Sequence, residues 1–202
     1  MVKLGLFGNG KNVPLQSITV TANIQDNFAE IDLVQVFFNE DPSPIECVYV
    51  FPLSGTNVCI FAFEVEMDGM KIVGKSTEND EAFAMYDDNI AKGNSAYIIE
   101  QTDQQDVFSA SIGNLQPGRK CSIRLRYITP VDAVNGGYAR RFVFPSSLIP
   151  QYRTLERTDS GSGYPPMSPR KRRNDEPFYL MKFQGKVKML GQIKSVDAMN
   201  HQ

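Results

Sequence analysis

The feature that most constrains this chain is a regular alternation of apolar and polar residues over most of its length. Successive side chains of an extended strand point to opposite faces of a sheet, so a period of two is typical of half-buried strands. In residues 17–24 the apolar positions on one face are Ile18, Val20, Ala22 and Ile24. The same alternation returns in residues 29–38, 58–67, 95–101, 107–115 and 121–127. We therefore expect a mostly all-β chain.

Turn sequences separate these segments and indicate antiparallel hairpins. Asp68 and Gly69 stand between two alternating segments, and this dipeptide is the strongest short signal for a two-residue hairpin. Residues 116–119 and 135–137 are further turn sequences, rich in glycine. Many short strands with frequent turns are typical of an antiparallel β-sandwich.

One segment, about 78–92, has helical spacing instead. Phe83, Tyr86 and Ile90 fall on one side of it, acidic residues begin it, and Gly93 follows its last residue. The sequence therefore predicts an antiparallel β-sandwich with one inserted α-helix.

The chain contains three cysteines, which we expect to be buried thiols. Cys47, Cys59 and Cys121 all lie in apolar alternating segments, and an odd number in a reducing compartment argues against a disulfide framework. In residues 58–67 the alternation assigns to the core face Cys59, Phe61, Phe63, Val65 and Met67.

The composition divides the chain into three parts. Residues 1–153 hold the alternating segments, whereas residues 154–177 are rich in proline and poor in aliphatic side chains, which is typical of a flexible linker. Residues 178–202 form a short β tail, in which we expect a strand pair with a turn near Gly185. Because two strands alone are marginal, the tail should dock on its own sandwich or pair with another chain. Docking is favoured, since the linker keeps the effective concentration high.

A basic cluster stands in the linker and is the sharpest local charge feature. It consists of Arg170, Lys171, Arg172 and Arg173. One interpretation is a nuclear-import or polyanion-binding patch, with Ser168 before Pro169 as a candidate phosphorylation switch. The alternative is a solvated loop, because acidic residues follow directly at 175 and 176.

Residues 5–12, GLFGNGKN, lack only the final hydroxyl residue of a phosphate-binding loop. Such a loop needs a buried strand before it and a helix after it, so that backbone N–H groups face the phosphates. Gly5 has four residues before it, and Lys11 is followed by Asn12 and then by Pro14 and another strand pattern. We interpret the segment as a hairpin, with residues 4–7 pairing against residues 14–18.

The sequence indicates no catalytic residues, metal or cofactor. The single histidine, His201, leaves no internal base for a nucleophilic serine or cysteine, and the cysteines lack zinc-ligand spacing. Residues 159–163 fail the D-x-S-x-S metal motif at Gly161, where the motif requires serine. The acidic pairs at 64 and 66 and at 87 and 88 are expected to be solvated faces.

Charge and hydropathy exclude two classes of partner. A net charge of −2 gives no overall attraction to nucleic acid, and no apolar run is long enough to cross a bilayer. The first residues lack the apolar region of a signal peptide. We expect a cytoplasmic protein, with the nucleus as the alternative, that binds an unidentified protein partner and neither a membrane, a specific nucleic acid nor a small-molecule substrate.

Several longer stretches together resemble a known family. In order along the chain they are EDPSPIECVYVFPL, FEVEMDGMKIVGK, YDDNIAKGNSAYIIEQ, DVFSASIGNLQPGRKCSIRLRY and RFVFPSSLIPQY. They are similar to the VIT domain, the vault protein inter-alpha-trypsin domain, over about residues 4–152. Within that family the chain resembles the N-terminal region of the von Willebrand factor A domain-containing protein 5 group. Residues 178–196 resemble the strands that follow the VIT domain in the family.

The resemblance implies a β-sandwich that has no catalytic residues of its own. We therefore expect a non-enzymatic protein-interaction or scaffold domain. An alternative is an accessory domain of a multi-domain or multi-chain enzyme, as resemblance to the vault poly(ADP-ribose) polymerase allows. The second alternative is nuclear or polyanion binding through residues 170–173.

The sequence of residues 5–12 and its surroundings predict that the chain does not bind ATP. Calorimetric titration with ATP and Mg²⁺ should give no saturable heat, because neither flanking element of a phosphate loop is present. Saturable binding that disappears in the Lys11→Ala variant would contradict this prediction.

Overall fold

Two large β-sheets account for most of the structure, which is a computed structural model describing residues 5–8, 10–52, 58–73, 97–101, 107–145 and 179–198. The five-stranded sheet has the order β2-β1-β5-β9-β8. Its strands are β1 (Gly5–Gly8), β2 (Lys11–Asn12), β5 (Ile45–Pro52), β8 (Tyr97–Gln101) and β9 (Val107–Leu115).

The six-stranded sheet has the order β13-β3-β4-β10-β6-β7. Its strands are β3 (Leu15–Gln25), β4 (Phe28–Phe38), β6 (Cys59–Met67), β7 (Met70–Val73), β10 (Lys120–Pro130) and β13 (Leu180–Lys188). A small hairpin of β11 (Asp132–Val134) and β12 (Ala139–Arg141) encloses the 3-10 turn η1 (Asn135–Gly137). All described strand pairs are antiparallel except β13 with β3, which is parallel.

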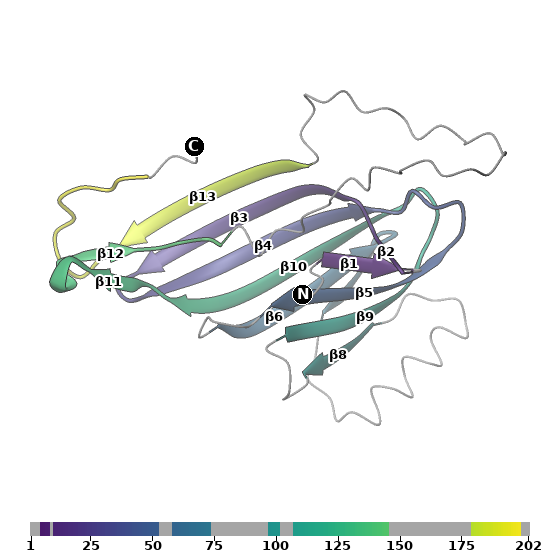
Figure 1. Cartoon of the computed structure of the whole chain (residues 1–202), viewed down its shortest axis with the longest axis horizontal. Helices are drawn as coiled ribbons and strands as arrows, with labels where there is room; N and C mark the ends of the chain where they lie inside the picture. The colour runs from purple at the N-terminus through teal and green to yellow at the C-terminus, as the bar shows by residue number, and fades with distance from the viewer. Residues whose placement is uncertain are drawn as a thin grey trace, which may run out of the picture.

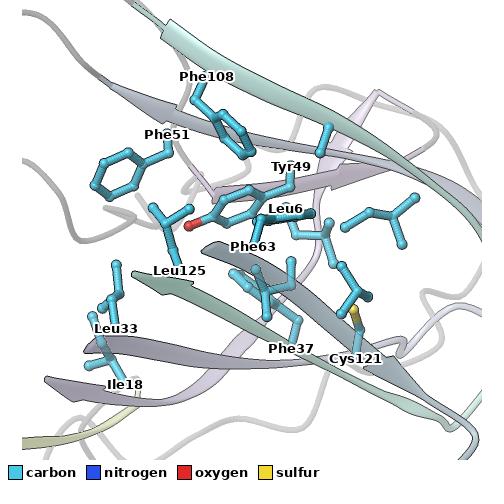
Figure 2. Close-up of a cluster of buried hydrophobic side chains, with 14 of the residues drawn as sticks. Leu6, Ile18, Leu33, Phe37, Tyr49, Phe51, Phe63, Phe108, Cys121 and Leu125 are labelled. Carbon is cyan, nitrogen blue, oxygen red and sulfur yellow. The ribbon is translucent and has the colours of Figure 1, made fainter. Parts of the chain in front are cut away.

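The two sheets lie face to face and enclose one apolar core (Figures 1 and 2). On β3 and β10 the inward residues are those that the alternation assigned to the core, so the all-β prediction is confirmed. An aromatic layer joins the sheets: the ring of Tyr49 lies 5.9 Å from Phe63, and Phe63 lies 5.1 Å from Phe108. The Tyr49 hydroxyl donates a 2.7 Å hydrogen bond to Oε1 of buried Gln35, which satisfies two polar groups inside the core.

Three of the segments discussed above lie outside the described residues. These are the predicted helix at 78–92, the linker at 154–177 with its basic cluster, and residues 199–202, which include His201. Within the described part, the 3-10 turn η1 is the one helical element.

The predicted turns occur where the sequence placed them. Between β6 and β7, Asp68 and Gly69 have φ values of 51° and 77°, the left-handed conformation that a two-residue hairpin needs and that this dipeptide tolerates. Gly118 has a φ of 68° in the turn between β9 and β10.

Strands β1 and β2 form a hairpin, but the partner strand differs from the prediction. Phe7 pairs with Asn12, and Gly8 pairs with Lys11, so β1 and β2 make a very short ladder. Residues 15–25 belong to the other sheet, where β3 pairs with β4. The predicted pairing of residues 4–7 with residues 14–18 is therefore wrong, because the chain crosses between the sheets just after Asn12.

Strand β6 contains a break that corrects the predicted core face. Leu125 pairs with Phe63 and Arg126 with Ala62, but Tyr127 then pairs with Ile60, so Phe61 is an extra residue. A bulge of one residue inverts the alternation beyond it. Phe63, Val65 and Met67 are buried as predicted, whereas Phe61 and Cys59 are exposed and Ile60 packs against the core.

The other two cysteines are buried free thiols, as predicted. Burial, helped by the charge of Glu46, raises the pKa of Cys47 to about 12, and burial also raises the pKa of Cys121. Both therefore stay protonated at neutral pH and behave as small apolar side chains.

The tail lies on its own chain as one strand. Leu180 pairs with Ser17 and Lys188 with Gln25, and Gly185 pairs with Ala22 in the middle of the ladder. The predicted strand pair with a turn near Gly185 is therefore wrong. A single glycine does not make a turn here, because the residues on both sides of Gly185 continue the same strand alternation.

Asn39 fixes the corner where the chain leaves β4 for the other sheet. Its buried side-chain amide donates to the backbone carbonyl oxygens of Leu115 (2.8 Å) and Ser43 (3.1 Å). Its Oδ1 accepts a 2.9 Å hydrogen bond from the backbone N–H of Asp41. Because Leu115 ends β9, this one side chain joins both sheets at their crossing.

We predict that Asn39→Ala lowers the free energy of unfolding by about 2–3 kcal/mol, because it leaves buried backbone groups without partners. Chemical denaturation with urea measures the change. The control is Asn23→Ala on β3, where the exposed asparagine should be replaced at a cost within about 0.5 kcal/mol. Equal effects of the two substitutions would contradict the role of Asn39.

Candidate interaction surface

On the outer face of the six-stranded sheet, charged residues of β4, β6 and β10 lie beside one another. The register places Arg124 between Val34 and Glu64, and Arg126 between Asp32 and Ala62. Residues directly or diagonally opposite on neighbouring strands are close enough for their side chains to interact. The sequence thus brings basic residues of β10 between acidic residues of β4 and β6.

Asp32 and Arg124 form the best-aligned ion pair of this face. Arg124 donates from Nε to Oδ1 of Asp32 at 2.8 Å and from Nη2 to Oδ2 at 2.5 Å. This two-bonded geometry suits the planar guanidinium. The hydrogen bond to Asp32, together with the charge of Glu64, raises the pKa of Arg124.

Glu64 is the centre of the charged face. Its carboxylate lies 3.0 Å from Nζ of Lys71, 3.6 Å from Nη1 of Arg124 and 3.7 Å from Nη2 of Arg126. The hydrogen bond from Lys71, followed by the three positive charges, lowers the pKa of Glu64. Glu64 therefore stays ionised and holds the basic side chains in place.

The bulge in β6 adds an aromatic ring to this charged face. The guanidinium carbon of Arg126 lies 5.4 Å from the centroid of the Phe61 ring, within cation–π range. The Phe61 side chain is 47% exposed, so the ring is shared between Arg126 and solvent.

Further apolar residues continue this surface towards one end of the sheet. Ile128 pairs with Glu30 on one side and with Cys59 on the other, and Phe28 is its diagonal neighbour opposite Pro130. All of these outward apolar side chains are exposed. We call this surface the bulge patch, which consists of Phe28, Cys59, Phe61, Arg126 and Ile128.

The bulge patch contains none of the candidate residues that the sequence suggested. Those candidates, Arg170 to Arg173 and Ser168, lie outside the described residues and remain predictions. Of the acidic pairs, Glu66 is exposed as expected, whereas Glu64 lies in the ion network instead of simply in solvent. Arg124 and Arg126 alternate with the core residues of β10, so the sequence indicated that both side chains point outward. It did not indicate which residues of the neighbouring strands lie beside them.

In the part of the chain that the structure describes, no three histidine, cysteine, aspartate or glutamate side chains gather as they would around a metal ion. Over the same ranges, no helix has the length and hydropathy to cross a membrane.

A family model for the Vault protein inter-alpha-trypsin domain, VIT, matches residues 15–127, from the start of β3 almost to the end of β10. The chain belongs to the VIT domain family. The resemblance seen in the sequence is thereby confirmed, and β1, β2 and β13 lie outside the matched range.

Two relatives show how the domain occurs in larger proteins. The von Willebrand factor A domain-containing protein 5A of Rattus norvegicus is 37% identical over 156 residues, 77% of this chain and 19% of that protein. Protein mono-ADP-ribosyltransferase PARP4 of Homo sapiens is 34% identical over 142 residues, 70% of this chain and 8% of that protein. This chain thus spans less than a fifth of the length of either curated relative.

Among solved structures, an M1 zinc metallopeptidase from Deinococcus radiodurans aligns with a TM-score of 0.31 and 13% identity, over 64% of this chain and 24% of that one. A likeness this weak carries no functional argument.

We predict that Glu64→Gln destabilises the chain by about 0.5–1 kcal/mol at pH 7, a small amount because the basic partners are partly exposed. Since the pKa of Glu64 is lowered from its ordinary value of 4.5, the stabilisation is complete above that pH and is lost as the pH falls through the lowered pKa. Urea unfolding at several pH values should show the two proteins converging in acid.

Glu66→Gln is the matched control, because it changes the same kind of side chain on the same strand outside the ion network. A stability difference for Glu64→Gln that persists unchanged at low pH would show that lost packing, and not the ionised carboxylate, is responsible.

Proposed function

We propose that this chain is a non-enzymatic protein-interaction domain that binds its partner through the bulge patch. The observation that carries the proposal is the contact of the exposed Phe61 ring with Arg126 beside the ion network of Glu64. Aromatic residues and arginine are the types most enriched at interface centres, where they supply most of the binding energy. Charged residues surround the two, as in the polar rim of an interface.

The network around Glu64 supports this role by holding one half of the stacked pair. The Arg126 guanidinium contacts both the Phe61 ring and the Glu64 carboxylate, which restricts its position before a partner arrives. A side chain that is already ordered loses less conformational entropy on binding. The patch is therefore a preorganised surface of apolar and cationic character.

A second candidate function is an accessory domain within an enzyme. It is favoured by the match to PARP4, whose name describes that protein as a mono-ADP-ribosyltransferase. The matched stretch is also shared with the von Willebrand factor A domain-containing protein 5A, whose name describes no enzyme. A module common to both is better suited to binding than to the transferase chemistry. The scaffold role, the cytoplasmic location and the protein partner stay predictions.

We predict that Phe61→Thr lowers recovery of the bound partner by about tenfold or more, the loss expected for an interface anchor. Threonine is β-branched and favours extended backbone, so the sheet should be retained. Quantitative affinity purification of the tagged chain from cells, followed by titration of the purified partner, measures the effect.

The matched control is Tyr138→Thr, which removes an aromatic ring that is 97% exposed at the β11–β12 hairpin. Thermal unfolding should show both variants folded. Equal recovery of the partner by both variants would exclude the bulge patch as the binding surface, and recovery of an enzyme subunit would favour the accessory role.

A further inference from the structure

Strand β13 forms one edge of the six-stranded sheet and is paired on one side only within the described chain. It runs parallel to β3 from Leu180 to Lys188, and no described strand pairs with its other side (Figure 1). A strand at a sheet edge leaves backbone N–H and C=O groups available for another strand.

The two faces of this edge strand differ in character, one being mostly apolar and the other carrying three lysines. Met181, Phe183 and Val187 pair with Ile18, Val20 and Ile24, so they share the inner face of the sheet. On the outer face the residues are Leu180, Lys182, Gln184, Lys186 and Lys188.

The apolar face of β13 is only half covered. The Phe183 ring lies 6.4 Å from Phe142 and 6.3 Å from Phe144, yet Phe183 is 46% exposed and Met181 is 45% exposed. Gly185 leaves a gap between the Phe183 and Val187 side chains. A Cβ atom placed on Gly185 would lie 3.6 Å from the Phe183 ring, which is an ordinary van der Waals contact. An incoming side chain of another strand therefore has apolar neighbours at this edge.

The C-terminal end of β13 is fixed to the hairpin between β3 and β4. The Asp26 side chain accepts a 2.8 Å hydrogen bond from the N–H of Leu190, and the N–H of Asp26 donates to the Lys188 carbonyl at 3.2 Å. The edge is thus held in an extended form and is already prepared for pairing.

The positive charge on the outer face of β13 favours a partner strand with acidic residues. Lys182, Lys186 and Lys188 form no ion pair among the described residues, and the β3 residues opposite them are the neutral Thr19, Asn23 and Gln25. A second copy of β13 would bring lysines against lysines, and like charges opposite each other are destabilising. An acidic strand would meet three unneutralised positive charges.

We propose that the free edge of β13 binds an extended segment of another protein in which apolar and acidic residues alternate. The segment adds to the sheet as a further strand through backbone hydrogen bonds. Its apolar side chains contact Met181, Phe183 and Val187, and its carboxylates lie along the lysines. This surface is separate from the bulge patch and deepens the proposed interaction function by naming the chemistry of a ligand.

The test uses a fluorescein-labelled peptide of about eight residues, the usual length of a strand, that alternates valine and glutamate. Fluorescence anisotropy with the full chain should show saturable binding, and amide hydrogen exchange should slow at residues 180–188. A peptide of the same composition with valines and glutamates in separate blocks should bind much more weakly. Equal binding of the two peptides, or protection elsewhere, would overturn the proposal.

The double variant Lys182→Glu/Lys186→Glu should weaken binding by about tenfold or more and favour a valine–lysine peptide instead. The matched control is Lys11→Glu/Lys120→Glu, which makes the same charge change at exposed residues of other strands and should bind as the parent does. If the control loses binding equally, net charge alone attracts the peptide and the proposal fails.

Two further measurements distinguish peptide binding at the β13 edge from binding at the bulge patch and from dimerisation of the chain. Phe61→Thr should leave peptide binding unchanged, so failure of the bulge patch and failure of the β13 edge are distinguishable. Sedimentation of the chain at increasing concentration should show a monomer. A dimer that Lys182→Glu/Lys186→Glu alters would place a second copy on the edge and overturn the proposal.

Discussion

Packing of the two sheets against each other is the constraint on which the rest of this structure depends. The aromatic layer of Tyr49, Phe63 and Phe108 fills the space between the sheets, and the hydrogen bond from Tyr49 to Gln35 satisfies the polar groups that enter it. Because a strand has two faces, burying one face commits the other to solvent. The charged network around Glu64 is therefore a consequence of core formation on the same strands.

The bulge at Phe61 is where core packing and surface chemistry meet. Adding one residue between the pairs of Arg126 and Tyr127 lets Ile60 pack on the core and turns Phe61 outward. The exposed ring then lies beside Arg126, which the ion network already positions. A regular strand would have placed Phe61 in the core and Ile60 on the surface, and no stacked pair would exist. Bulges commonly redirect side chains in this way.

The two proposed surfaces use different physics and lie on different parts of the sheet. The bulge patch offers side chains on the face of central strands, where the backbone groups are already paired. The β13 edge offers backbone groups, with lysines that disfavour self-association and favour an acidic strand. A single domain with both surfaces can contact two partners at once, which is consistent with an interaction module.

The sequence by itself determined the local features of this protein. The period of two fixed the strands and most core positions, Asp68-Gly69 fixed a hairpin, and the longer motifs indicated the VIT family, because each of these signals depends on neighbours along the chain. Strand pairing depends on residues far apart, so only the tertiary structure decided that Arg124 lies between Asp32 and Glu64, and that Asn39 reaches Leu115. The same holds for the bulge that exposes Phe61 and Cys59 and for the passage of β13 straight through Gly185, since a register shift or a parallel partner leaves no mark in local alternation.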